Sequence, residues 1–85
     1  MGQYGKLAQR ILSGQQDKSI LFSEALSLMQ RLGFSIRIRG SHHIFFKEGI
    51  EEIINLQPDG SKAKAYQVRQ IRNLMVKYHL GVEDE

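Results

Sequence analysis

The fold is decided by residues 34–47, which read FSIRIRGSHHIFFK. In the first half, apolar residues alternate with polar or basic ones, a period of two that is typical of a strand with one buried face. Gly40 begins the expected turn, and residues 42–47 predict a second strand that runs back along the first. The stretch therefore predicts an antiparallel hairpin whose first strand carries Arg37 and Arg39 on its exposed face.

The sequence on either side predicts one more strand and three helices. Apolar residues at helical spacing indicate helices over residues 4–12, 23–32 and 65–78. After a turn at Gly49, residues 52–57 are expected to form the third strand. Helices on one face of a small antiparallel sheet make an α+β fold, and they leave the other face of the sheet open to solvent. A functional site is expected on that open face.

Local signals predict where these elements end. Ser23 is the expected N-cap of the second helix, and Gly33 is its expected left-handed stop. Gly81 is expected to end the last helix, and Pro58-Asp59-Gly60 predicts a turn. The positions expected to face the core are Phe22, Ala25, Leu26, Met29 and Leu32 in the second helix, and Val68, Ile71, Tyr78 and either Leu74 or Met75 in the last.

The composition indicates one small globular domain of 85 residues. The chain has no cysteine, which excludes disulfides and thiolate chemistry. It has no signal-peptide pattern and no apolar run of the roughly 20 residues that a membrane span needs, so we expect a cytoplasmic protein. Outside the acidic C-terminus at residues 83–85, twelve Lys and Arg residues stand against six acids, a net charge of +6. Such an excess attracts polyanions, although an ordinary lysine-rich surface explains it equally well.

His42 and His43 must point to opposite faces of their strand. If Phe45 is buried, His43 shares its face and His42 lies on the open side; if Phe46 is buried, the roles reverse. Periodicity alone leaves both arrangements possible, and we favour His42 on the open face because the turn before it leaves room for a ligand. The other histidine is then expected to be structural.

An exposed histidine at this point is a weak candidate for two kinds of site. Zinc binding is disfavoured because the chain lacks cysteine and His79 lies far along the last helix. A serine triad is disfavoured because Ser41 adjoins His42 and no acid is placed to orient the ring. Cleavage of RNA fits better, since the 2′-hydroxyl of the substrate is the nucleophile and the protein supplies a proton carrier and positive charge. The simpler alternative is a histidine that only packs and hydrogen-bonds at the start of a strand.

Two lysines add a second basic element. Lys62 and Lys64 precede the last helix, where unpaired N–H groups and the helix dipole favour an anion. Arg69, Arg72 and Lys77 follow along that helix, where they either line the same path or are solvated surface charges.

Three stretches together resemble the HicA family, the small toxins of type II toxin–antitoxin pairs. They are GSHHIF at 40–45, INLQPDG at 54–60 and KAYQVRQIRNLM at 64–75, within a resemblance from about Phe22 to Gly81. The resemblance implies a fold like that of double-stranded-RNA-binding domains, with an α-β-β-β-α core. It also implies an mRNA endonuclease that needs no metal or small-molecule cofactor, whose catalytic histidine follows Gly-Ser. A HicB-like antitoxin that covers this region is the implied partner.

The chain departs from the family pattern in two places. About twenty residues precede the first core helix, and FKEGIEEI at 46–53 replaces a histidine-proline turn found in many members. The expected organisation is one domain over 1–85, made of an N-terminal extension (1–21), a core (22–81) and an acidic tail (82–85).

The hypothesis from the sequence is an mRNA endonuclease in which His42 is the general acid or base. The RNA-binding residues would be Arg37, Arg39, Lys62 and Lys64, which hold phosphates, with Gly40 and Ser41, which position the scissile group. Two alternatives stay open: a non-catalytic RNA-binding module, and a protein-interaction domain that uses the open face of the sheet.

Overall fold

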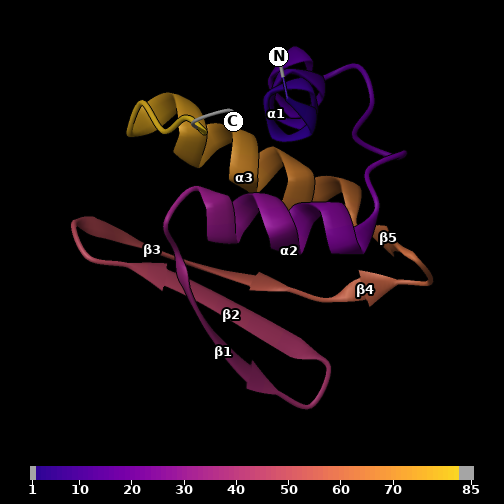
Figure 1. Ribbon diagram of the computed structural model, residues 1–85. Coiled ribbons are helices and arrows are strands. Elements are labelled where there is room, and N and C mark those ends of the chain that lie inside the picture. The colour runs from indigo at the N-terminus through magenta and orange to yellow at the C-terminus, as the bar shows by residue number, and fades with distance from the viewer. Residues whose placement is uncertain (1, 83–85) are drawn as a thin grey trace.

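The computed structural model describes residues 2–82 and has the predicted α+β architecture (Figure 1). Its elements are α1 (Gln3–Ser13), α2 (Phe22–Arg31), β1 (Ser35–Arg39), β2 (His42–Lys47), β3 (Ile50–Leu56), β4 (Pro58–Asp59), β5 (Lys62–Ala63) and α3 (Ala65–Lys77). Helices α2 and α3 cover one face of the sheet, and α1 packs on those two helices from the side away from the sheet. Apart from Val82, the predicted acidic tail lies outside the described residues.

The three long strands form an antiparallel sheet in the order β1-β2-β3. The register pairs Ile36 with Phe45, and Phe45 with Ile54, so these apolar side chains share the face that the helices cover. Between the pairs Phe45–Ile54 and Lys47–Ile50 the register shifts, so that one residue of β2 lies opposite three residues of β3. The helices cover only this face, so the opposite face of the sheet is open, as predicted (Figure 1).

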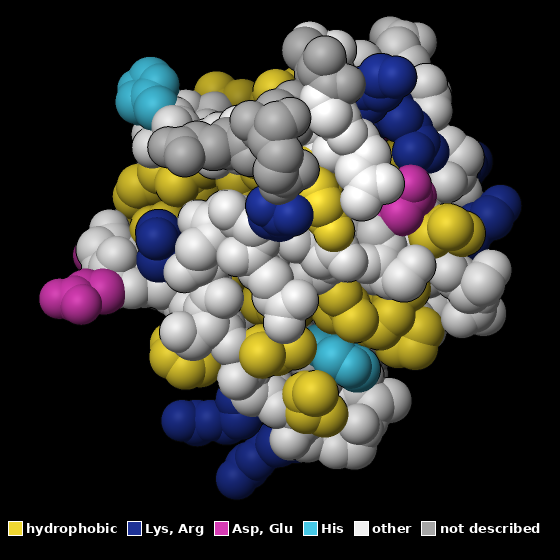
Figure 2. All heavy atoms as spheres, in the orientation of Figure 1, with side chains coloured by type: hydrophobic (Ala, Val, Ile, Leu, Met, Phe, Trp, Pro, Cys, Tyr) yellow, Lys and Arg dark blue, Asp and Glu magenta, His cyan; other side chains and the backbone are white. Residues whose placement is uncertain are grey.

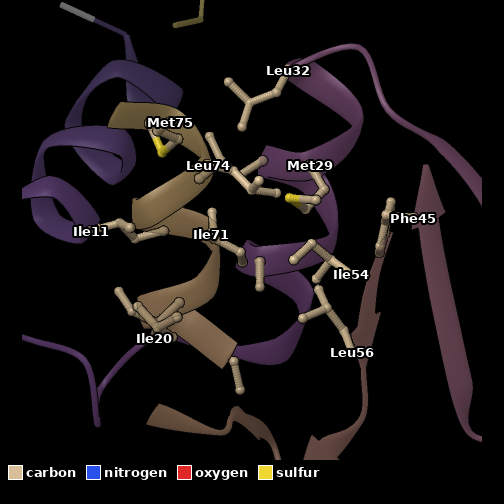
Figure 3. Packing of buried hydrophobic residues seen from close by; sticks show 14 of the residues in the cluster. Ile11, Ile20, Met29, Leu32, Phe45, Ile54, Leu56, Ile71, Leu74 and Met75 are labelled. Atoms are coloured by element: carbon tan, nitrogen blue, oxygen red, sulfur yellow. The ribbon is translucent and has the colours of Figure 1, made fainter. Parts of the chain in front are cut away.

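The core lies between the sheet and the helices (Figure 3). Phe45, Ile54 and Leu56 point from the strands toward Met29 of α2 and Ile71 of α3. The predicted helix faces are confirmed at Ala25, Met29, Leu32, Val68 and Ile71, whereas Phe22, Leu26 and Tyr78 are only partly buried. Leu28 joins the core as well, and both Leu74 and Met75 are buried rather than one of them.

The N-terminal segment forms a third layer and closes the core from behind. Leu7 and Ile11 of α1, with Ile20 of the following loop, are buried against the other helices. The loop is held by Asp17, whose carboxylate accepts from both terminal nitrogens of Arg72 at 2.9 and 3.2 Å. Arg72 also donates to the carbonyl of Ile11 at 3.1 Å. Arg72, which the sequence left between a phosphate contact and a solvated charge, is therefore a structural residue.

Two predicted helix ends are wrong. Helix α2 begins at Phe22 with Leu21 as its N-cap, not Ser23. The chain is held extended up to this point by two backbone contacts. Leu21 forms an isolated antiparallel β-bridge with Lys62, and the Phe22 amide donates to the carbonyl of Ser61 at 2.9 Å. The carboxylate of Glu24, at the third helical position, then accepts from the amide of the N-cap residue Leu21 at 2.9 Å, which is one of the two hydrogen bonds of a capping box.

Gly81 does not end α3. The left-handed residue is His79, with φ of 54°. The Leu80 amide donates to the carbonyl of Met75 at 2.9 Å, which completes a Schellman motif two residues before the glycine. The apolar Leu80 packs against the core. This packing compensates for the cost of the left-handed conformation at the non-glycine residue His79.

Replacement of Arg72 tests how the third layer is held. Arg72→Ala removes the guanidinium that binds Asp17 and the Ile11 carbonyl, so we expect the free energy of unfolding to fall by about 1.5–3 kcal/mol. Urea denaturation followed by circular dichroism measures the change. Arg69→Ala, an exposed arginine one turn earlier on the same helix, is the matched control and should stay within about 0.5 kcal/mol. Equal losses for the two variants would contradict the role of Arg72.

At the C-terminal end of α3, Glu52 of β3 accepts hydrogen bonds from Lys77 at 2.8 Å and from the Tyr78 hydroxyl at 2.5 Å. These contacts, that with Lys77 first, lower the pKa of Glu52 from 4.5 to about 2. A depressed carboxyl pKa stabilises the fold above the unfolded-state value and ceases to do so as the pH falls through the folded-state value.

The stability contributed by Glu52 should therefore disappear between pH 4.5 and about 2. Glu52→Gln removes the titrating group, so the stability difference between wild type and variant should shrink across this range. Urea unfolding at successive pH values measures it. If the difference in the free energy of unfolding stays constant down to the lowest pH, Lys77 and Tyr78 do not stabilise the charged form of Glu52.

Candidate active site

The open face of the sheet carries the candidate residues in cross-strand rows. Arg39 of β1 lies opposite His42 of β2, and Arg37 lies opposite Ile44. On the other side of β2, Ile44 is paired with Asn55 of β3. Basic side chains project from the lower edge of the molecule, where β1 lies (Figure 2). The register thus brings Arg37, Arg39 and His42 together, as the sequence predicted.

The structure resolves which histidine faces solvent. Phe45 is fully buried, so His43 shares the covered face and His42 lies on the open one. The ring of His43 meets the ring of Phe22 edge to face at a centroid distance of 5.1 Å, and its Nδ1 lies 3.2 Å from the carbonyl of Ser41. His43 is half-buried and packed, whereas His42 is exposed.

Two carboxamides from β3 and its extension hold the His42 ring. Nδ1 lies 3.3 Å from Oδ1 and 3.0 Å from Nδ2 of Asn55, and Nε2 lies 3.1 Å from Nε2 of Gln57. A carboxamide presents an acceptor at one end and a donor at the other, and it exchanges them by a half turn. His42 can therefore keep a partner on each nitrogen whether the ring carries one proton or two.

The strand that supplies these carboxamides is held by a third one, in the core. Gln67 of α3 is fully buried. Its Nε2 donates to the carbonyl of Asn55 at 3.1 Å, and its Oε1 accepts from the amide of Gln57 at 3.4 Å. Residues two apart in a strand direct their backbone groups to the same side, so one side chain completes the free edge of β3 at the two residues that contact His42.

The β1–β2 turn lies beside this ring and is open. Gly40 has φ of 59°, a left-handed conformation that favours glycine, and no atom lies within 4 Å of the position a Cβ would take. Ser41 is exposed. The turn that precedes His42 is therefore uncovered at Gly40.

The two predicted lysines lie on the segment that follows Gln57. Lys62 is exposed in β5, where the strand register puts it opposite Asp59 of β4. Lys64 is the N-cap residue of α3. Neither of them takes part in the hydrogen bonds of His42 in the described part of the chain. They form a separate basic element at the N-terminus of α3. Of the other predicted cations, Lys77 is engaged by Glu52 and Arg69 lies beside the loop at 14–19.

Sequence reasoning missed Asn55, Gln57 and Gln67. The first two alternate with the buried Ile54 and Leu56, and this pattern could have placed them on the open face. Gln67 stands four residues before Ile71 on the apolar stripe of α3, where a polar side chain is a signal of a buried hydrogen-bonded group.

Comparison with known proteins gives a family. The family model described as HicA toxin of bacterial toxin-antitoxin matches residues 22–77. Neither the curated proteins nor the solved structures gave a match. Within residues 2–82, no three His, Asp or Glu side chains are grouped so as to hold a metal ion, and no helix is long and apolar enough to cross a membrane.

Gln67→Leu tests the link between the core and the site. The variant puts an apolar side chain of similar size in place of the carboxamide and leaves the Asn55 carbonyl and the Gln57 amide without a partner, so we expect a loss of about 1–3 kcal/mol in the free energy of unfolding. Hydrogen exchange of the Gln57 amide should also become faster. Gln70→Leu, at an exposed position of the same helix, is the control and should change neither quantity. Unchanged exchange at Gln57 in Gln67→Leu would contradict the link.

Proposed function

The chain belongs to the HicA toxin family of bacterial toxin–antitoxin systems, and we propose that it is a metal-independent endoribonuclease that cuts mRNA. The observation that carries the proposal is the exposed ring of His42, held by Asn55 and Gln57 and placed opposite Arg39. Function within the cytoplasm is part of the same proposal.

His42 moves the proton in the proposed reaction. The 2′-hydroxyl of the RNA attacks the adjacent phosphate, its proton leaves, and a proton is returned to the departing 5′-oxygen. Asn55 holds Nδ1, so Nε2 is the nitrogen that exchanges a proton with the substrate, while Gln57 contacts it in the absence of RNA. General acid–base help of this kind contributes about 10²–10⁴-fold in rate.

The cations around the ring supply the second requirement, which is positive charge at the phosphate. Arg37 and Arg39 project from the same face as His42 and stabilise the charge that builds up on the phosphate oxygens. The open turn at Gly40 and Ser41 lets the backbone of the RNA approach the ring. Lys62 and Lys64 bind phosphates further along the strand, at the N-terminus of α3.

Membership of a toxin family also implies a cognate antitoxin. We propose that this partner is a HicB-like protein that neutralises the toxin by covering the open face of the sheet. A short reading frame for such a protein next to this one in the genome would support the proposal.

Replacement of His42 tests the nuclease directly. His42→Ala removes the proton carrier and leaves the arginines in place, so cleavage of mRNA by the purified protein in the presence of a chelator should slow by about 10²–10⁴-fold. RNA binding should persist and weaken linearly with salt on a log–log scale. Cleavage is followed by gel electrophoresis of end-labelled RNA, and growth arrest on induced expression gives a second readout.

His43→Ala is the control for His42, because it changes the neighbouring histidine on the covered face. It should lower stability and retain cleavage at temperatures where it is folded. A His42→Ala protein that still degrades RNA and arrests growth would refute the assignment, and a stable but inactive His43→Ala protein would show that the other histidine acts. A wild-type protein that binds RNA and never cleaves it would be an RNA-binding module instead.

A further inference from the structure

The open face changes character along β2, from polar at His42 to apolar at its far end. Phe46 follows the fully buried Phe45, and alternation puts its ring on the open face with 39% of the residue exposed. Ile53 of β3 is 65% exposed toward the same end. The core does not need this second aromatic ring, since Phe45 already fills the covered side.

Phe46 lies in line with the candidate active site. Residues 42, 44 and 46 point to the same side of one strand, and four residues of strand span about 13 Å. Arg37 stands between the two ends, because it is paired with Ile44 and its guanidinium carbon lies 5.8 Å from the centre of the Phe46 ring. The guanidinium of Arg37 thus lies over the ring of Phe46, on the same face of the sheet as His42.

We propose that Phe46, together with Arg37, forms a stacking subsite for one base of a single-stranded RNA, about 13 Å along the strand from His42. The proposal rests on the proposed nuclease function and specifies its substrate as a single strand that crosses the open sheet. Bases stack on aromatic rings and on guanidinium planes when they are not paired, whereas a duplex keeps its base faces covered.

Charge favours RNA over a protein as the occupant of this subsite. The ring is adjacent to Arg37, and Arg39 lies in the next row, so an occupant must bring negative charge as well as a flat apolar face. A nucleotide has both in one unit. Stacking tolerates every base because each has a π-face, so the subsite would add affinity and register with little sequence preference.

The test uses His42→Ala protein, which we expect to bind RNA with little cleavage, and oligoadenylate as the probe. Adding Phe46→Leu keeps an apolar side chain of similar size and removes the aromatic face, so the dissociation constant should rise by about 5- to 100-fold. Adding Phe46→Trp should leave affinity unchanged or tighter. Ile53→Ala, which removes a more exposed apolar side chain from the same face, is the matched control and should change affinity by less than about threefold.

Binding is measured by fluorescence anisotropy, and a series of oligoadenylates with one abasic position each locates the stacked base. The Phe46→Leu penalty should vanish at one abasic position and persist at the others. Equal RNA affinity of the Phe46→Leu and parent proteins overturns the subsite. If this variant also loses binding of the antitoxin, the ring serves the antitoxin and not the RNA. Either result leaves cleavage by His42 intact, whereas a His42→Ala protein that binds no RNA at all would overturn the nuclease proposal together with the subsite.

Discussion

One buried carboxamide joins the core of this protein to its open face. Gln67 is a polar side chain at a core position, where an unpaired amide would be costly. It is tolerated because both of its ends are used, one by the carbonyl of Asn55 and one by the amide of Gln57. The edge of β3 needs the same two hydrogen bonds, since no further strand pairs with it there. The carboxamide of Gln67 and the free edge of β3 thus satisfy each other's hydrogen bonds. These bonds hold α3 against β3 at one register.

The functional consequence lies on the opposite side of β3. The two residues whose backbones Gln67 holds are the residues whose side chains contact the His42 ring. A change in the position of α3 is therefore expected to move Asn55 and Gln57, the partners of His42. Helix α1 and the Asp17–Arg72 pair contact α3 on the side away from the sheet. They help to fix the position of α3, and through Gln67 the position of β3. We therefore expect the N-terminal segment to support the candidate site, although it lies on the far side of the helices.

The alternation of residues 34–47 was enough to predict the hairpin, the open face and the neighbourhood of His42 with Arg39, because strand pairing across a short turn is local. The partners of His42 were not predictable in the same way. They depend on how β3 is aligned with β2, and the irregularity between Phe45 and Lys47 alters that alignment without an obvious sequence signal. The end of α3 was missed for another reason: the packing of Leu80 outweighed the preference for glycine and placed His79 in the left-handed region.

The choice of amides around His42 has an electrostatic meaning for the proposed reaction. A carboxylate on Nδ1 would orient the imidazole and favour its charged form, but it would also place a negative charge close to a bound phosphate. Asn55 and Gln57 orient the ring without a charge, so Arg37 and Arg39 act on the phosphate without an opposing anion beside the histidine. In the proposed reaction, a proton taken up by the ring adds positive charge on the face where the RNA substrate would lie. Neutral partners therefore orient the ring without setting a negative charge beside the phosphate of the proposed substrate.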